Sequence, residues 1–202
     1  MKTIRIIGFM LASMIAVQGY SQAQFALGLK GGLNFSNLDV KQSAGANYNN
    51  RTGYHAAAFA LIKFTKIGIQ PEIQFSRQGS KYTFNSQDFD ANFDYINVPI
   101  LLKLYTIGGL NLQAGPQVGF MSTAQLKSTV SGITSTQDVK DYYKKSDVSL
   151  AAGIGWDLPF GLTIDARYIF GLSKINDNVS IPDTKNKTIQ VSVGYKLIKL
   201  GN

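Results

Sequence analysis

The sequence predicts an all-β protein, an eight-stranded antiparallel up-and-down transmembrane β-barrel with short periplasmic turns and long extracellular loops. Three observations lead to this fold class. Eight segments alternate apolar with polar or small residues at period two, and no helical segment remains to cover their apolar rows. The connections between these segments alternate between short and long. The row opposite the apolar one is rich in glycine and polar residues, as expected inside a narrow barrel.

Composition narrows the chemistry that is available to this chain. Its 202 residues include no cysteine, which excludes disulfides and thiol catalysis, and His55 is the lone histidine, which argues against a zinc site. We predict no metal and no cofactor. The net charge of +8 includes Lys2 and Arg5, and the basic residues are scattered over strand ends and connections. We therefore expect no nucleic-acid partner.

Residues 1–23 have the features of a secretory signal peptide. Two basic residues near the start precede an apolar run over residues 6–17, which is too short to span a bilayer as a helix. Small residues, Ser21 and Ala23, occupy the positions that a signal peptidase requires. The sequence thus predicts export through the Sec pathway, cleavage after Ala23, and one mature domain, an outer-membrane β-barrel over residues 24–202.

The first four predicted strands cover residues 25–35, 53–64, 67–78 and 93–105. In the fourth, five apolar residues occupy every second position, which is the period of a strand. The first and third alternate in the same way, whereas a run of alanines weakens the register of the second. The predicted outward residues are Phe25, Leu27, Leu29, Leu33 and Phe35; Tyr54, Ile62 and Phe64; Ile67, Ile69, Pro71, Ile73 and Phe75; and Ile96, Val98, Ile100, Leu102 and Leu104.

The last four predicted strands cover residues 110–121, 147–158, 162–172 and 188–197. Each alternates as the first four do, and each is close to the roughly 9–11 residues that a tilted membrane strand needs. The predicted outward residues are Leu110, Leu112, Ala114, Val118 and Phe120; Val148, Leu150, Ile154 and Trp156; Leu162, Ile164, Tyr168 and Phe170; and Ile189, Val191, Val193, Tyr195 and Leu197.

Connection length separates the two ends of the predicted barrel. The short connections are residues 65–66, 106–109 and 159–161, and each lies between strands that form a hairpin. The long connections are residues 36–52, 79–92, 122–146 and 173–187, which are rich in Ser, Asn, Asp, Thr and Lys. Outer-membrane barrels keep short turns on the periplasmic side, so both chain ends are expected there.

Charged residues of mixed sign fall on the inward rows of the predicted strands. Charges inside a low-dielectric wall must be paired or hydrated. We predict that they form a polar network that plugs the interior, with a proton or ion path as the alternative. The predicted network comprises Lys30, Lys63, Glu72, Lys103, Asp157, Asp165, Arg167 and Lys196.

Aromatic residues concentrate toward the strand ends, where the two membrane interfaces should lie. Two aromatic girdles are typical of such barrels, although aromatic residues also favour strands in general. The predicted girdles are Phe25, Phe64, Trp156 and Tyr195 near the short turns, and Phe35, Tyr54, Phe75, Phe120 and Phe170 near the long loops.

Three prolines fall in the middle of consecutive predicted strands: Pro71, Pro99 and Pro116. Proline cannot donate to a strand ladder and belongs at edges or bulges. A closed barrel has no edge, so we expect local bulges or kinks at these positions.

Two segments, GLKGGLNFS at residues 28–36 and YINVPILLK at residues 95–103, are similar to motifs of an outer-membrane β-barrel family common in Bacteroidota. Its members are often described as porin-family or PorT-like. The cleavage region at residues 21–24 also resembles the signal peptides of that family. The resemblance covers essentially the whole mature chain and implies a small eight-stranded barrel without catalytic residues. The chain departs from many such barrels because it does not end on an aromatic residue; Tyr195 and Leu197 are the expected substitutes.

No nucleophile elbow and no phosphate-binding loop is present in the sequence. The residual catalytic candidate is His55, which we expect near the outer rim, with Ser36, Ser76 and Ser80 within topological reach. No spacing selects one of these serines. We therefore interpret His55 as a polar rim residue and predict that the protein is not an enzyme, with a rim acyltransferase or lipase as a less favoured alternative.

The predicted function is that of a monomeric integral outer-membrane protein with a structural or surface-binding role through its extracellular loops. Its expected partners are outer-membrane lipid and lipopolysaccharide, the barrel assembly machinery, and an extracellular ligand that the sequence does not identify. A small porin-like channel or transport component is the main alternative. A soluble lipocalin-like carrier is a further one, and its apolar rows would point inward.

Overall fold

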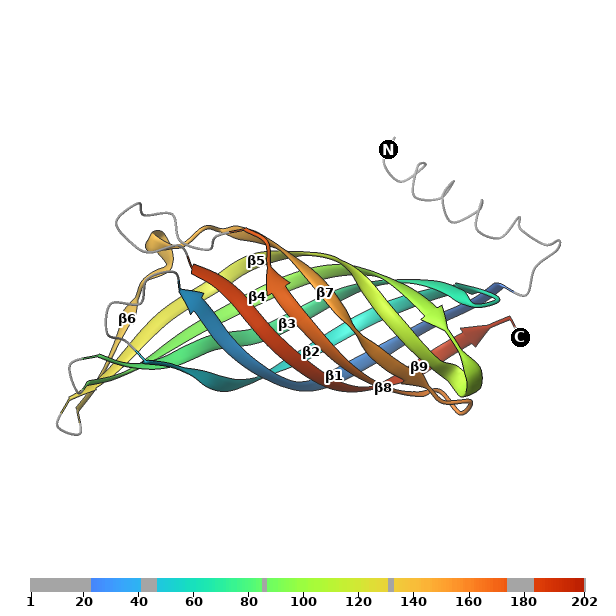
Figure 1. Ribbon diagram of the computed structural model, residues 1–202, viewed down its shortest axis with the longest axis horizontal. Helices are drawn as coiled ribbons and strands as arrows, with labels where there is room; N and C mark the ends of the chain where they lie inside the picture. The colour runs from blue at the N-terminus through green and yellow to red at the C-terminus, as the bar shows by residue number, and fades with distance from the viewer. Residues whose placement is uncertain (1–22, 41–46, 85–86, 131–132, 174–183, 202) are drawn as a thin grey trace, which may run out of the picture.

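The strands close into a ring through hydrogen bonds between neighbours (Figure 1). The computed structural model describes residues 23–40, 47–84, 87–130, 133–173 and 184–201. Within these ranges the ring order is β1-β2-β3-β4-β5-β7-β8-β9, and β9 pairs with β1. The elements are β1 (Ala23–Val40), β2 (Asn47–Phe64), β3 (Ile67–Phe84), β4 (Gln87–Tyr105), η1 (Ile107–Gly109), β5 (Leu110–Val130), β6 (Ile133–Asp138), η2 (Lys140–Tyr142), β7 (Ser146–Asp157), β8 (Leu162–Gly171) and β9 (Thr184–Leu200).

Alternation along each strand separates an outer row from an inner row. In β9, Ile189, Val191 and Val193 are exposed, whereas Gln190 and Ser192 between them are buried. The neighbouring strands also keep their apolar rows on the outer face, because a slip of one residue in the pairing would turn every apolar side chain inward. The eight-stranded antiparallel up-and-down barrel predicted from the sequence is therefore confirmed.

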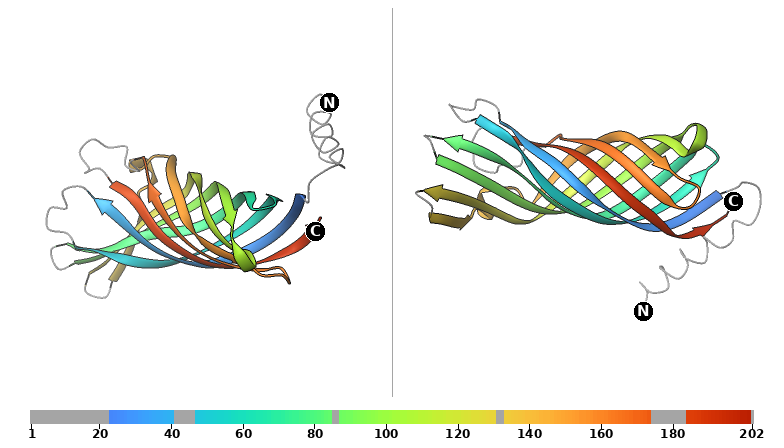
Figure 2. Two further views of the ribbon diagram at one scale, coloured as in Figure 1. Left: turned by 45° about the vertical axis from the view of Figure 1, so that its right-hand side comes forward. Right: turned by 90° about the horizontal axis from the view of Figure 1, so that it is seen from below.

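The three short connections lie at one end of the barrel, as predicted, together with the two ends of the described wall, Ala23 and Gly201 (Figures 1 and 2). The connection between β4 and β5 is the single turn η1. Gly108 and Gly109 in this turn have φ values of 66° and 84°, which side chains rarely tolerate. The Trp156 indole donates a hydrogen bond of 2.9 Å to the Gly108 carbonyl and ties the turn to the outside of β7.

At the opposite end the strands run further than the sequence predicts. Residues 79–92 were expected to form a loop, but β3 and β4 continue as a paired hairpin from Gly79↔Asn92 to Phe84↔Gln87. Likewise β5 continues to Val130 and pairs with β6. The predicted loop bounds are wrong because these extensions lie beyond the apolar band. Neither face of the strands meets lipid there, so the sequence shows no alternation of apolar and polar residues. Residues 174–183, within the fourth predicted loop, lie outside the described residues.

The expected bulges at the three prolines are not present. The β3–β4 register is unchanged from Pro71↔Ile100 to Gln74↔Asn97, and the β4–β5 register is unchanged on both sides of Pro116. The pairing skips residues 72–73 with 98–99 and residues 100–101 with 115–116, and then resumes without a shift. The lost donors therefore cause gaps rather than insertions, since an inserted residue would reverse the two faces of every following position.

Residues 1–22 lie outside the described residues, so the signal peptide and the cleavage after Ala23 stay predictions. In the part of the chain that the structure describes, no helix is long and apolar enough to cross a membrane.

Candidate functional site in the barrel interior

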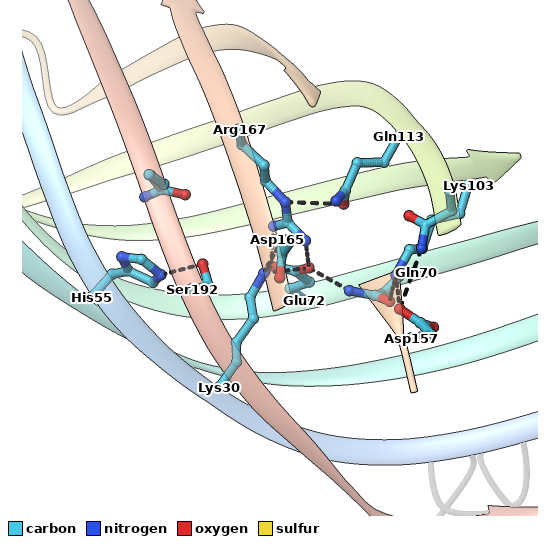
Figure 3. Close-up of polar contacts among 12 residues, drawn as sticks. Lys30, His55, Gln70, Glu72, Lys103, Gln113, Asp157, Asp165, Arg167 and Ser192 are labelled. Atoms are coloured by element: carbon cyan, nitrogen blue, oxygen red, sulfur yellow. Dashed lines mark hydrogen bonds and ion pairs between the residues drawn. The ribbon is translucent and has the colours of Figure 1, made fainter. Parts of the chain in front are cut away.

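Glu72 of β3 is the centre of an ion-pair cluster in the barrel interior (Figure 3). Its carboxylate accepts hydrogen bonds from Lys30 Nζ at 2.9 Å, Arg167 Nη1 at 3.0 Å and Gln70 Nε2 at 2.7 Å. Asp165 lies 2.6 Å from Arg167 Nη2 and 3.6 Å from Lys30 Nζ. All four charged side chains are buried, and two cations face two anions. The cluster is thus neutral, which is the condition for holding charges away from water.

A second cluster surrounds Asp157 of β7, nearer the short turns. Asp157 pairs with Lys103 Nζ at 3.0 Å and with Lys196 Nζ at 2.8 Å, and it accepts a 2.8 Å hydrogen bond from the Tyr105 hydroxyl. Lys103 also donates to Gln70 Oε1 at 3.2 Å. Since Gln70 binds Glu72, the two clusters form one connected network, to which six strands of the ring contribute: β1, β3, β4, β7, β8 and β9 (Figure 3).

The structure brings seven of the eight residues of the predicted network into these two clusters. Lys63 does not join either ion-pair cluster; its Nζ lies 4.3 Å from the centroid of the Tyr105 ring. Tyr105 and Gln70 were missed by the sequence analysis, although both stand on the inward rows. Tyr105 follows Lys103 at the strand period, so the same alternation could have identified it.

His55 lies inside the barrel and not at its outer rim, so that prediction is wrong. Its side chain is 2% exposed, with Nδ1 2.8 Å from Asn34 Oδ1 and Nε2 2.8 Å from Ser192 Oγ. The rim was misplaced because β2 begins at Asn47 and carries the wall well beyond His55. The hydrogen-bond partner is Ser192 of β9 rather than one of the three serines considered from the sequence. Closure of the ring creates this pair, because Gly32 of β1 pairs with His55 on one side and Ser192 on the other.

The proton positions around His55 follow from its partners. Asn34 donates through Nδ2 to Ser76 Oγ at 2.9 Å, so its Oδ1 is the acceptor and His55 Nδ1 carries the proton. Nε2 then accepts from the Ser192 hydroxyl, which is the arrangement of a serine with a general base. Ser192 is only 1% exposed, however, and a Cβ at Gly32 would lie 2.9 Å from His55 Cε1. The Ser192 hydroxyl is therefore enclosed by neighbouring side chains and backbone.

An apolar cluster fills the interior toward the long-hairpin end. Phe93, Tyr95 and Met121 are buried there, and Tyr143 packs on them from the segment after η2. The Phe93 and Tyr143 rings meet edge to face with centroids 4.9 Å apart. The cluster was not predicted, because Tyr143 comes from a polar segment with no strand periodicity. The apolar cluster and the two ionic clusters thus occupy successive parts of the interior.

The outward rows have no cover within the described chain. Ile73 is 66% exposed and Val193 is 53% exposed, and the outward positions of residues 67–75 and 189–197 carry no charge. Soluble monomers rarely expose contiguous apolar patches beyond a few hundred Å², whereas this band surrounds the barrel. Beyond Phe75 on the same row, Arg77 binds Asp94 through two hydrogen bonds of 2.7 and 2.8 Å and ends the apolar band.

Aromatic residues lie on the outer surface toward both ends of this band. Phe64, Trp156 and Tyr195 are exposed near the short turns, and Phe35, Tyr54 and Phe120 are exposed toward the hairpins. Phe25, Phe75 and Phe170, on the same rows, are partly exposed. The Arg77 guanidinium lies 5.5 Å from the centroid of the Tyr54 ring. This placement fits headgroup contacts, and the girdles themselves stay a prediction.

A closed ring of strands with an occupied core and an apolar exterior defines an integral membrane β-barrel. Over residues 20–177 the chain matches the family described as Outer membrane protein beta-barrel domain, and it belongs to that family. Membership places the protein in the bacterial outer membrane.

Known structures share the fold at low sequence identity. The chain is similar to Neisserial surface protein A, with 10% identity and a TM-score of 0.54, over 85% of this chain and 97% of that one. It is also similar to Ail, the attachment invasion locus protein of Yersinia pestis, with 17% identity and a TM-score of 0.54, over 89% and 99% of the two chains. None of the curated proteins matches. At these identities the likeness shows the fold alone.

Proposed function

We propose that this protein is a monomeric, non-enzymatic outer-membrane barrel that conducts no solute and presents a binding surface on its long extracellular hairpins. The observation that supports this most is the occupied interior. The connected Glu72 and Asp157 clusters occupy the interior above the short turns, and the apolar cluster around Phe93 occupies it toward the long hairpins. An eight-stranded barrel has an interior just wide enough for side chains to fill it.

The hairpins supply the surface for binding. They extend the wall beyond the apolar band, and exposed polar residues such as Lys81, Lys127 and Lys144 stand on or beside them. Loops and hairpins on a rigid scaffold are where binding residues concentrate. The proposed contacts are lipopolysaccharide and an extracellular ligand outside the cell, and the barrel assembly machinery during insertion. We also place the chain among the PorT-like proteins of Bacteroidota, on the resemblance of residues 28–36 and 95–103.

Planar-bilayer conductance tests the closed interior. We expect no steady open-channel current from the purified protein. The quadruple variant Lys30→Ala, Glu72→Ala, Asp165→Ala, Arg167→Ala removes all four charged side chains of the central cluster without changing the net charge. Its current would report that the protein had inserted. Large, steady currents from the unchanged protein would refute the proposal and favour the small channel.

The enzyme alternative has its own test. His55→Ala should leave the lipid composition of the outer membrane unchanged, because the Ser192 hydroxyl is enclosed and serves packing alone. A loss of one lipid modification, restored by the unchanged gene, would instead identify His55 as part of a catalytic site.

Export is tested by the mass and N-terminal sequence of the protein isolated from outer membranes. Cleavage after Ala23 gives a mature chain that begins at Gln24. A chain that keeps residues 1–23, or one recovered in solution without detergent, would contradict the proposed processing and location.

A further inference from the structure

A cavity of about 290 Å³ opens at the short-turn end of the barrel, opposite to the end with the long β3–β4 and β5–β6 hairpins. Its polar wall contains Lys63, Lys196, Lys199 and Asp157, and its apolar wall includes Leu61 and Leu200. The Asp157 cluster forms the inner wall of this cavity, because Asp157, Lys196 and Tyr105 line it. The open space on the outer side of this wall has no role in the proposed function.

The charges of the described side chains in the cavity wall do not balance. Asp157 is the one described carboxylate in the cavity wall, and it is already shared by Lys103 and Lys196. Lys63 contacts the Tyr105 ring, and Lys199 donates to the Pro159 carbonyl at 2.8 Å. Neither interaction supplies a negative charge.

The central cluster around Glu72 differs from this cavity in its charge balance. There, Lys30 and Arg167 are matched by Glu72 and Asp165, so the four charges cancel. In the wall of the short-turn cavity, counting the described side chains, three lysines face one aspartate, and Lys103 binds the same aspartate from the inner side. Unbalanced cations in a partly enclosed cavity attract an anion, and lysine ammonium groups bind phosphate well as point charges.

We propose that the short-turn cavity binds a phosphate group carried on an organic molecule, held by Lys63 and Lys199. The leucines beside the lysines suit a ligand with an apolar part next to its phosphate. Two sources share this chemistry: the headgroup of a phospholipid in the adjoining leaflet and a free phosphate ester. Basic pockets between transmembrane helices bind the headgroups of anionic lipids, and the same chemistry applies to a basic cavity at the end of a barrel.

The proposed cleavage would strengthen the site. Gln24 lines the same cavity, so cleavage after Ala23 puts the new α-amino group into its wall. The test therefore uses the mature protein, purified from outer membranes in uncharged detergent.

Trp156 provides the optical signal for the binding test. It is the only tryptophan in the sequence, and its indole binds the carbonyl of Gly108, which lines the cavity. Three probes are titrated: inorganic phosphate, glycerol phosphate, and a short-chain phosphatidylglycerol. Fluorescence is followed together with titration calorimetry.

The variants separate this cavity from general attraction to a basic protein. Lys63→Gln with Lys199→Gln removes two charges from the cavity, and Lys127→Gln with Lys145→Gln removes two exposed charges at the hairpin end. We expect saturable binding that the first pair weakens by about tenfold or more, as for loss of charge-assisted contacts, and the second pair by less than about twofold. The single variant Lys199→Gln, at an exposed position, serves if the double variant does not fold.

The outcomes decide between support and rejection. Tighter binding of the phosphatidylglycerol than of glycerol phosphate assigns the lipid headgroup, and equal binding assigns the free ester; both support the site. No saturable binding of any probe, or equal weakening by the two variant pairs, would overturn it. The conductance and hairpin proposals concern the other parts of the barrel and would be unaffected.

Discussion

Replacing Glu72 by glutamine tests whether the paired interior charges stabilise the barrel. The substitution keeps the size of the side chain and removes one negative charge from a neutral cluster. Lys30 and Arg167 are then left with Asp165 alone. Asp165 lies 2.6 Å from Arg167 but 3.6 Å from Lys30, so it cannot pair closely with both cations.

The expected loss in the free energy of unfolding is about 3–5 kcal/mol, the usual cost of removing one partner from a buried ion pair. The matched control is Asp90→Asn. Asp90 also pairs with an arginine, Arg51, at 2.7 Å, but the Asp90 side chain is 32% exposed. We expect the control to cost about 0–1 kcal/mol, as for ion pairs in contact with water.

Unfolding in urea from lipid vesicles measures both variants. Trp156 fluorescence reports the outer surface, and the heat-modifiable gel mobility reports the folded barrel. The double variant Glu72→Gln, Arg167→Met leaves Lys30 with Asp165 and restores neutrality, so it should lose less stability than the two single variants added together. If Glu72→Gln costs no more than Asp90→Asn, the interior is hydrated and the reasoning about the plug fails.

Two further predictions concern the wall. Gly79→Ala should loosen the β3–β4 hairpin and speed its proteolysis while the barrel stays folded, because φ is +145° and the new Cβ would lie 1.9 Å from the Ala91 carbonyl oxygen. The control is Gly108→Ala, which is also at positive φ but has nothing within 4 Å of the new Cβ. Equal rates of proteolysis in the two variants would contradict the prediction. Val193→Lys in the middle of the outward row should lower the free energy of unfolding in a bilayer by about 2–4 kcal/mol, and Leu197→Lys near the short turns by about 0–1 kcal/mol. The same urea titration measures both variants. Equal losses would argue against a lipid-facing row.

Most of the fold could be predicted because the bilayer imposes a simple pattern. A lipid-facing row must be apolar at every second residue, and β4 shows this from Ile96 to Leu104. Where the wall leaves the apolar band the constraint ends, and the strands around Gly79 and Val130 therefore looked like loops. The bulges expected at the prolines were wrong because a missing N–H donor does not by itself shift a strand. The apolar and polar faces of the strand keep the register unchanged there.

The composition of the interior network could be predicted, but most of its pairings could not. Inward parity selected Lys30, Glu72 and Arg167, although they lie far apart in the sequence. Which cation meets which anion depends on the stagger of neighbouring strands around the ring, and the sequence states no stagger. The contact between His55 and Ser192 shows the limit, because it needs β1 to sit between the second strand and the last one.

The order of side chains along the axis supports the proposal that this barrel binds at its ends and conducts nothing through its centre. A solute that crossed the barrel would have to displace Tyr143 from the apolar cluster, then separate Glu72 from Arg167, and then separate Asp157 from Lys103. Each ion pair separated inside the wall leaves buried charges uncompensated, at a cost of several kcal/mol. No comparable cost applies at the hairpins or at the short-turn cavity, which is open and carries the unpaired cations. Binding at the two ends, as we propose, would leave these ion pairs intact, whereas conduction would have to break them.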